Sequence, residues 1–399
     1  MAGSSKPVST GAVILAGALL LAGAMGIGRF AYTPLLPAMQ DALGWTVARA
    51  GDVASANFLG YLAGALLAST LAKRRGRWTW LIAGMLLSAA TTAAGVAVVS
   101  FSAWVAVRFL SGVASAFCLV LGTVVILEYL ARSAAVRFGA LHFSGVGAGI
   151  VVSVIVIEFA KTAGFSMFGR WGALGLVSVF LIGGAWIILR RLSGTDGAEQ
   201  IGTMQNRAPA SAGTGPSARI LLVKLIFAYG LFGFGYVVTA TFIVAMARRL
   251  EHASLVEPLT WIVVGLLAVP SVPLWQRVAR RFGMFAALRL AYGIEAVGVL
   301  LAGYGSGYAA LIIGGGLLGG TFAAITAIGL GAARQIAGPD VESVVGWMTA
   351  SFGLGQLIGP AVAGRLAEHT GGFGAPSLLA AGLLIIGVGL LLGAEKSIR

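Results

Sequence analysis

Residues 11–38 have the sequence GAVILAGALLLAGAMGIGRFAYTPLLPA, in which Arg29 is the one charged residue. A helix rises about 1.5 Å per residue, so a run of this length can cross the roughly 30 Å hydrocarbon core of a bilayer. The run is too long for a signal peptide, has no convincing cleavage site and is followed by many similar runs. We therefore interpret it as the first of a series of membrane-spanning helices.

The whole chain has the composition of a membrane protein. Of its 399 residues, 58% are hydrophobic and 10% are charged, whereas a soluble domain carries about 25% charged residues. The apolar runs are rich in Leu, Ala and Gly and lack the period-two alternation of membrane β-strands. At about 20 residues per span, the length allows about twelve helices. The sequence therefore predicts an all-α membrane protein.

A polar stretch divides the apolar spans into two sets of six. Residues 191–218 are rich in Gly, Ser, Ala and Pro and are typical of a flexible linker. We therefore expect an N-terminal half at 1–190 and a C-terminal half at 219–399. The expected spans are 11–38, 50–72, 78–99, 102–131, 137–161, 168–190, 220–248, 255–276, 284–304, 307–334, 341–368 and 374–394.

The two halves resemble each other at an offset of 207 residues. LAKRRG at 71–76 corresponds to VARRFG at 278–283, and each lies between the second and third span of its half. Parallel six-helix repeats are one plan of secondary transporters, with the substrate site near the membrane midplane between them. We expect twelve transmembrane helices in two pseudo-symmetric six-helix bundles. Glycines in the same register pair Gly26 with Gly233, Gly28 with Gly235, Gly112 with Gly319, Gly122 with Gly329 and Gly139 with Gly346.

The basic residues indicate the orientation. A net charge of +14 would suggest nucleic-acid binding in a soluble protein, but here the Lys and Arg residues lie mainly in loops between apolar spans. With the N-terminus inside, 18 of the 27 fall on the cytoplasmic side, six on the opposite side and three within spans. This bias predicts a multi-pass inner-membrane protein with both termini in the cytoplasm and no nucleic-acid partner.

The basic loops after the second and eighth spans resemble motif A of the major facilitator superfamily, Gly-x-x-x-Asp-Arg-x-Gly-Arg. Arg74, Gly76 and Arg77 fit the first copy, and Arg281 and Gly283 fit the second. In the family these loops help to latch the cytoplasmic side. The alternative is that they are plain topological charge.

This sequence departs from motif A at its acidic position. Lys73 and Arg280 stand where the motif has aspartate. Glu128, at the expected cytoplasmic end of the fourth span, is the candidate substitute for the missing carboxylate.

Residues 108–116, RFLSGVASA, resemble motif B at the start of the fourth span. Arg108 is followed at positions i+4 and i+8 by Gly112 and Ala116, and small residues on one helix face let a neighbouring backbone approach closely. Arg108 either faces a cavity or snorkels to the outer interface.

Two further stretches resemble one branch of that superfamily. GIGRFAYTPLLPAMQDALGW at 26–45 is similar to the first helix of the YbfB/YjiJ-like branch, and HFSGVGAGI at 142–150 is similar to its fifth helix. The resemblance covers essentially the whole chain. It implies the fold and the transport of a solute, and little about the chemistry.

Three charged residues of the first half are predicted at similar depth. Arg29 lies about nine residues before the outer end of its helix, or about 13 Å deep, and a charge at that depth normally faces a cavity or a carboxylate. We expect Arg29, Arg108 and Glu158 to form one cluster for substrate or proton coupling. The alternatives are a structural pair of Arg29 with Glu158, and a local pair of Glu158 with Lys161.

Other polar residues within the spans have a candidate role in transport or in structure. His142 could relay protons, or it is a hydrogen-bonded packing residue. Glu295 and Arg289 are expected to be structural. The expected substrate cavity is formed by Tyr32, Asn57, Tyr236, Thr239, Thr326 and Gln356.

Motifs of other functional classes are absent from the sequence. It contains no G-x-x-x-x-G-K-[ST] phosphate loop, no H-E-x-x-H and no G-x-S-x-G, so we expect no enzyme, cofactor or metal. We predict a monomeric secondary transporter that moves a small organic solute by alternating access, with the proton as coupling ion. The buried cations tilt this prediction towards anionic or zwitterionic solutes. The alternatives are a proton-driven efflux pump for amphiphilic drugs or metabolites, and a membrane sensor.

Overall fold

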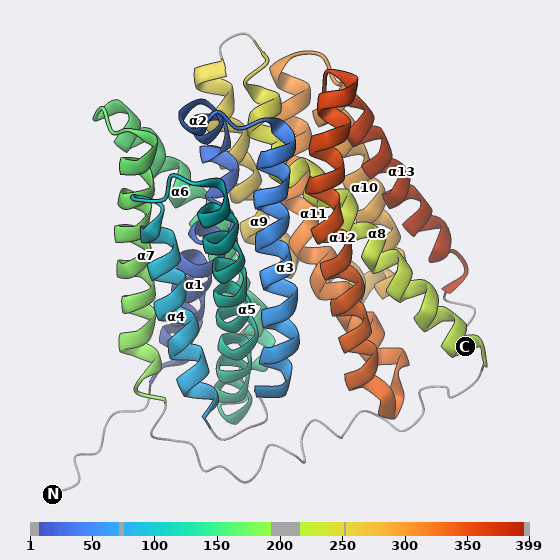
Figure 1. Cartoon of the computed structure of the whole chain (residues 1–399). Helices are drawn as coiled ribbons and strands as arrows, with labels where there is room; N and C mark the ends of the chain where they lie inside the picture. The colour runs from blue at the N-terminus through green and yellow to red at the C-terminus, as the bar shows by residue number, and fades with distance from the viewer. Residues whose placement is uncertain (1–7, 72–75, 193–215, 251–252, 395–399) are drawn as a thin grey trace, which may run out of the picture.

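The computed structural model describes residues 8–71, 76–192, 216–250 and 253–394. These residues form helices that pack side by side in one bundle (Figure 1). We call one end of the bundle the linker end, where α7 ends at Leu189 and α8 begins at Pro216. The opposite end, where α2 ends at Leu43 and α8 ends at Ala247, is the far end.

The helices form two groups that pack mainly within themselves. In the first group, α5 packs against α3 and α4, and α7 against α1 and α4. The first group consists of α1 (Thr10–Leu21), η1 (Ala22–Ile27), α2 (Tyr32–Leu43), α3 (Val47–Leu71), α4 (Arg77–Ala94), α5 (Phe101–Arg132), η2 (Val136–Phe143), α6 (Ser144–Thr162) and α7 (Met167–Leu189).

In the second group, α11 packs against α9 and α10, and α13 against α8 and α10. The second group consists of α8 (Pro216–Ala247), α9 (Ala253–Phe282), α10 (Met284–Tyr304), α11 (Gly307–Ile336), η5 (Gly338–Asp340), α12 (Val341–Thr370) and α13 (Gly374–Leu390).

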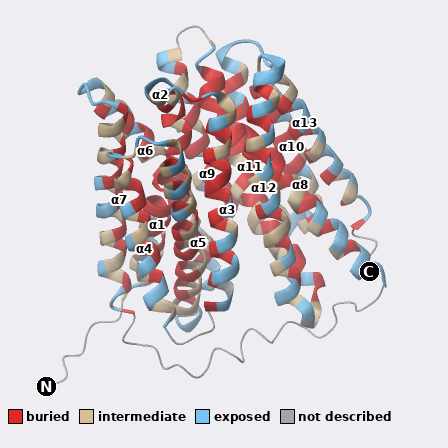
Figure 2. Ribbon diagram, in the orientation of Figure 1, coloured by how far each residue is buried: buried red, intermediate tan, exposed pale blue. Residues whose placement is uncertain are grey.

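Many of these helices have the length and composition of membrane spans. Exposed residues lie along the outer helices of the bundle (Figure 2). They include large apolar side chains, for example Phe180 at 70% exposure. Eight helical segments of the described chain are long and apolar enough to cross a membrane, and Gly374–Leu390 is a shorter apolar helix. The eight are Thr10–Leu43, Phe101–Arg132, Val136–Thr162, Met167–Leu189, Pro216–Ala247, Ala253–Phe282, Met284–Tyr304 and Gly307–Ile336.

Each expected span contains a helix, with boundaries that differ by several residues. Pro216 begins α8, so the helix reaches back into the stretch 191–218 that the sequence assigned to a linker. Most of that stretch, 193–215, lies outside the described residues.

The first expected span, 11–38, is not one continuous helix. Its α1 passes into the π-helical turn η1, and residues 28–31 form turns before α2 begins at Tyr32. Backbone hydrogen bonds from Arg29 to Met25 and from Ala31 to Ile27 continue through this stretch, but within the described chain the Gly28 and Arg29 carbonyls lack a helical backbone donor. Pro34 and Pro37, which lack the backbone N–H of a regular helix, come after this break. Pro34 lies in the first turn of α2, where a residue without an N–H is tolerated. The carbonyls beside the break are therefore left for side chains to bind.

The two groups meet along two pairs of helices, α3 with α12 and α6 with α9. Gly147 of α6 lies so close to α9 that a Cβ there would stand 2.7 Å from the Val269 nitrogen. Beside these pairs, the Thr33 hydroxyl donates a 2.8 Å hydrogen bond to the Ala240 carbonyl. Thr33 and Ala240 are 207 residues apart, so repeat-related positions meet between the groups.

Charged residues join the two groups at the far end. Arg365 of α12 donates to both carboxylate oxygens of Asp52 on α3, at 2.7 and 3.1 Å. Arg248 contacts Asp41 at 2.5 Å and also donates to the Pro37 carbonyl at 2.8 Å. We call these four side chains the far-end bridges. They link α2 and α3 to the second group at that end.

Candidate functional site

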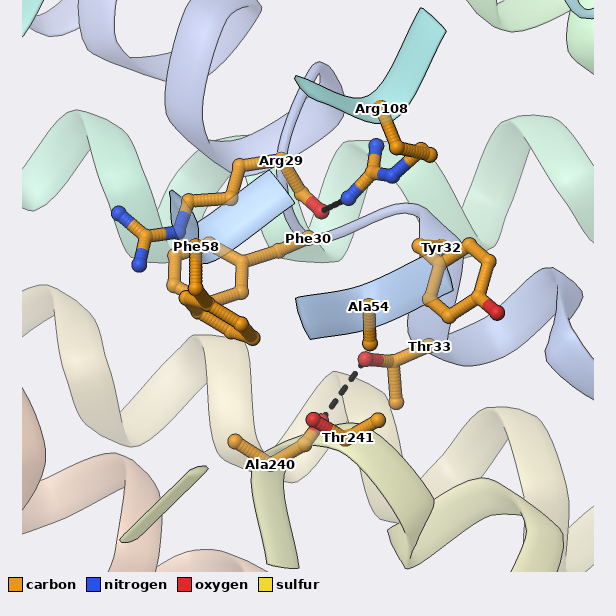
Figure 3. A pocket seen from close by; sticks show the side chains of 9 residues that line it. All are labelled: Arg29, Phe30, Tyr32, Thr33, Ala54, Phe58, Arg108, Ala240 and Thr241. Carbon is orange, nitrogen blue, oxygen red and sulfur yellow. Dashed lines mark hydrogen bonds between the residues drawn. The ribbon is translucent and has the colours of Figure 1, made fainter. Parts of the chain in front are cut away.

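A cavity lies between the two groups, beside the break in the first helix (Figure 3). It has a volume of about 20 Å³, which is room for about one water molecule. The Thr33–Ala240 hydrogen bond crosses its wall. The lining residues are Arg29, Phe30, Tyr32, Thr33, Ala54, Phe58, Arg108, Ala240 and Thr241.

Arg29 is a buried cation with unused hydrogen-bond donors. Its residue surface is 4% exposed, and within the described chain its Nε and Nη2 atoms have no hydrogen-bond partner. The guanidinium carbon lies 4.1 Å from the ring centroid of Tyr61 and 4.8 Å from that of Phe58. Cation–π contacts of this kind stabilise the charge, but they do not satisfy N–H donors. An anionic group could.

Arg108 is buried to a similar degree but has partners. Its Nη1 donates to the Gly28 carbonyl at 2.9 Å and its Nη2 to the Arg29 carbonyl at 2.8 Å. The Ser111 hydroxyl also donates to the Gly28 carbonyl. These carbonyls are therefore not free for a ligand, because Arg108 and Ser111 bind them. The residue does not snorkel to the interface either, since it is 3% exposed.

The small residues after Arg108 let α5 pack closely against α3, which brings the Arg108 side chain to the break in the first helix. A Cβ on Gly112 would stand 2.6 Å from the Tyr61 nitrogen, so the glycine lets α5 lie directly against α3. Asn57 on α3 donates from Nδ2 to the Arg108 carbonyl at 2.9 Å. The expected close approach on this helix face is confirmed, and it fixes the start of the Arg108 side chain.

Two residues of the first half, Tyr32 and Asn57, were predicted to line the substrate cavity, and of these Tyr32 lines the cavity between the two groups. The Tyr32 hydroxyl donates to the Ala50 carbonyl at 2.8 Å. Asn57 is 1% exposed, and its Oδ1 has no hydrogen-bond partner in the described chain. Its amide links α3 to α5 by the bond to Arg108.

The second group contributes an aromatic wall. Tyr236 lines a second cavity of about 10 Å³ and is hydrogen-bonded to Gln356 Nε2. Its ring is nearly parallel to those of Phe322 and Phe352, at 8° and 5°. Thr239 is fully buried, and its hydroxyl has no partner among the described residues.

Thr326 is part of the framework around this wall. Its hydroxyl donates to the Phe322 carbonyl at 3.0 Å, and its own carbonyl accepts from the Tyr229 hydroxyl at 3.1 Å. Neither cavity has Thr326 in its lining. We therefore assign it to the support of the aromatic wall.

The prediction that Glu158 forms a cluster with Arg29 and Arg108 is wrong. Glu158 Oε2 accepts from Lys161 Nζ at 3.3 Å, and the Glu158 side chain is 34% exposed. The helix spacing i to i+3 favours this local pair. The carboxylate therefore remains near the far end, and Arg29 and Arg108 line the cavity without it.

His142 is a packed residue with both ring nitrogens occupied. Its Nδ1 lies 2.5 Å from the Gly139 carbonyl and its Nε2 lies 3.1 Å from the Thr123 hydroxyl. The ring is 1% exposed. The packing alternative fits this geometry better than a proton relay does.

Glu128, the candidate substitute for the missing aspartate of the first basic loop, contacts an arginine of that loop. Arg77 contacts Glu128 at 2.6 Å, as expected if Glu128 replaces the missing aspartate. This pair joins α4 to α5 within the first group. Gly76 caps the start of α4 with φ of 101°, a conformation that favours glycine. Arg74 and Lys73 lie outside the described residues.

The glycine of the second basic loop, Gly283, has the same backbone role as Gly76. Gly283 precedes α10 with φ of 90°, so both motif glycines turn the chain into the next helix. Arg281 is exposed, and its guanidinium lies 5.4 Å from the centroid of Phe282.

Sequence reasoning missed the aromatic residues that hold Arg29 and line the cavities. Phe58 and Tyr61 are three residues apart on α3, a spacing that places them on one helix face, and this was the available signal. Phe30, Trp261 and Phe322 gave no comparable signal, because aromatic residues are common in any membrane helix.

Comparison with known proteins agrees with this architecture. Residues 21–392 match the family described as "Uncharacterised MFS-type transporter YbfB". The chain belongs to this family. Membership places it among the major facilitator transporters and confirms the resemblance of its first and fifth helical segments to that branch.

Solved structures and one curated relative extend the comparison. Two crystal structures of the nucleoside transporter NupG, one of them a point mutant, align with a TM-score of 0.67 over 97% of this chain and 99–100% of theirs. At 14–15% identity they show the fold alone. A chloramphenicol resistance protein of Streptomyces lividans is 28% identical over 206 residues, which is 51% of this chain and 48% of that protein.

Proposed function

We propose that this protein is a proton-coupled secondary transporter that moves a small organic anion or zwitterion across the inner membrane by alternating access. Twelve spans in two bundles of six would carry this activity: α1 to α2 form the first, η2 with α6 the fifth, and the remaining helices one each. The linker end would face the cytoplasm, as the distribution of basic residues favours.

The observation that carries this proposal is the incompletely hydrogen-bonded guanidinium of Arg29. Two of its nitrogens lack hydrogen bonds, and the residue lines a cavity between the two groups. An unpaired charge buried at this depth is costly, so a carboxylate or phosphate that reached the cavity would gain a charge-assisted hydrogen bond. A second supporting observation is the link between the two groups at the far end by Arg365–Asp52 and Arg248–Asp41. Alternating access requires the groups to close on one side at a time.

The coupling proton needs an acid, and Glu295 replaces Glu158 as our candidate. Glu295 lies on α10, is fully buried with the Thr321 hydroxyl as its polar neighbour, and has no cationic partner within the described chain. An unpaired acid inside a membrane bundle is expensive to retain for structure alone. We therefore assign Glu295 to proton binding and the half-exposed Glu158–Lys161 pair to the edge of the bundle.

The proposal is tested by flux in proteoliposomes of the purified full chain. Under an imposed pH gradient, carboxylates should accumulate or be expelled faster than from liposomes without protein, and Arg29→Gln should abolish the difference. Arg137→Gln, on an exposed arginine, is the matched control and should transport normally. Equal flux in the Arg29→Gln protein would contradict the anion site.

A second candidate function is proton-driven efflux of amphiphilic drugs. It is favoured by the similarity of half of this chain to a chloramphenicol resistance protein and by the apolar lining of the second cavity. The two candidates differ in the role of Arg29. Drug efflux predicts that lipophilic cations or neutral drugs stabilise the protein and that Arg29→Gln retains this stabilisation.

A further inference from the structure

The second cavity adjoins the one that contains Arg29. The two cavities share Phe30 and Ala240 in their walls, so a ligand bound at Arg29 would reach the second cavity past these residues. The remaining walls of the second cavity are Ile150, Tyr236, Trp261, Val264, Leu318 and Phe322. Four of its eight lining residues are therefore aromatic.

Three of these rings are held at fixed angles to one another. The rings of Tyr236 and Phe322 are within 8° of parallel, with centroids 5.9 Å apart. The Phe30 ring meets Phe322 edge-on at 70° and 6.0 Å. Aromatic rings prefer offset-stacked or edge-to-face neighbours at these separations. The wall therefore offers both kinds of contact to a planar ring.

Trp261 adds a second donor without a partner. Its indole Nε1 is buried and has no hydrogen bond in the described chain, although an indole N–H only donates and is costly to bury unsatisfied. Trp104 and Trp171 also have unpartnered indole nitrogens among the described residues, but of these three tryptophans only Trp261 lines either of the two cavities. The Trp275 Nε1 donates to the Gly320 carbonyl at 2.8 Å. Each cavity therefore has a lining residue with unused donors: Arg29 in the first and Trp261 in the second.

We propose that the substrate class is an aromatic carboxylate, an inference that rests on the proposed function. The carboxylate binds Arg29, the ring lies among Phe30, Tyr236 and Phe322, and a polar ring substituent accepts a hydrogen bond from Trp261. Cavities of about 20 and 10 Å³ are too small for such a molecule. Its entry requires the two groups to separate at this site, as alternating access provides.

The test measures binding of four matched probes to the full chain in nanodiscs by calorimetry. Benzoate should bind more tightly than cyclohexanecarboxylate by about threefold to tenfold, the fold-change that corresponds to a ring–ring contact. Benzamide, which has the ring without the charge, should not bind. The binding of 4-hydroxybenzoate should be tighter than that of benzoate.

Variants assign each preference to a residue. Phe322→Leu should remove the advantage of benzoate over cyclohexanecarboxylate, and Trp261→Phe should remove the advantage of 4-hydroxybenzoate over benzoate. Phe227→Leu, on a ring that is 63% exposed on α8, is the control and should change neither ratio. Unchanged melting temperatures would show that the variants remain folded.

The outcomes separate the two proposals. Equal binding of benzoate and cyclohexanecarboxylate, both lost in Arg29→Gln, would overturn the aromatic class and leave the anion transporter standing. Failure of every carboxylate to bind or to be transported would overturn the proposed function together with this inference. Retention of the 4-hydroxybenzoate advantage in Trp261→Phe would overturn the role of the indole.

Discussion

Arg29 and Arg108 line the same cavity and are almost equally buried, at 4% and 3% exposure. Their surroundings differ. Arg108 donates to two carbonyls that the break in the first helix leaves free, whereas Arg29 lies over aromatic rings with two nitrogens unpartnered among the described residues. Residue type and depth are therefore poor guides to role. The partners of each guanidinium assign Arg108 to the fold and leave Arg29 available for a ligand.

Removing Arg108 should produce the largest loss of stability. Arg108→Leu leaves the Gly28 and Arg29 carbonyls short of donors, and a buried group that loses its partner costs about 1–3 kcal/mol. The melting temperature of the purified protein should fall clearly, and transport should fall with it. Measurement by fluorescence-detected size-exclusion after heating, with Arg137→Leu as the control, checks this. An unchanged melting temperature would mean that Ser111 or water supplies the missing donor.

Removing Arg29 should have the opposite pattern. Replacing a poorly paired buried charge by an apolar residue is often neutral or stabilising, by about 1–4 kcal/mol. Arg29→Leu should therefore keep or raise the melting temperature while abolishing transport of carboxylates. The same heating assay and proteoliposome flux measure the two quantities. If Arg29→Leu instead destabilised the protein as much as Arg108→Leu, the contrast between the two arginines would be lost.

The two acids provide a third contrast. Glu295→Gln should remove the dependence of transport on an imposed pH gradient while leaving substrate binding intact, because it removes the buried proton-binding group. Glu158→Gln should leave both properties unchanged, since its partner Lys161 lies on the surface. Counterflow, which needs no gradient, separates loss of coupling from loss of transport. A normal pH response in Glu295→Gln would require another coupling group.

The smallest expected effect concerns the aromatic wall. Tyr236→Phe removes the hydroxyl that contacts Gln356 but keeps the ring, so the net loss in stability should be about 0.5–1.5 kcal/mol. Substrate preference should shift while the pH dependence of transport stays the same. Competition between pairs of substrates measures the preference, and Gln356→Leu should shift it in the same direction.

The sequence determined the helices and missed the geometry of the break. Apolar runs far longer than a strand could only be helices in this composition, so every expected span contains one. The apolar run 11–38 predicted one continuous span, but a π-helical turn and the turns at residues 28–31 interrupt the α-helix. That break is stable because Arg108 and Ser111, from a distant part of the chain, bind its carbonyls.

The candidate site divides in the same way. Composition and motifs identified Arg29, Arg108 and Glu128 as unusual residues, and local helix spacing already allowed the Glu158–Lys161 pair. Depth estimates placed Glu158 near the arginines because they describe distance along a helix and contain nothing about the direction a side chain faces. The sequence by itself determined that Arg29 and Arg108 are buried, because each lies within a long apolar run. Only the tertiary structure decided which of them have partners, because a partner must come from another helix that packs at the right height and angle.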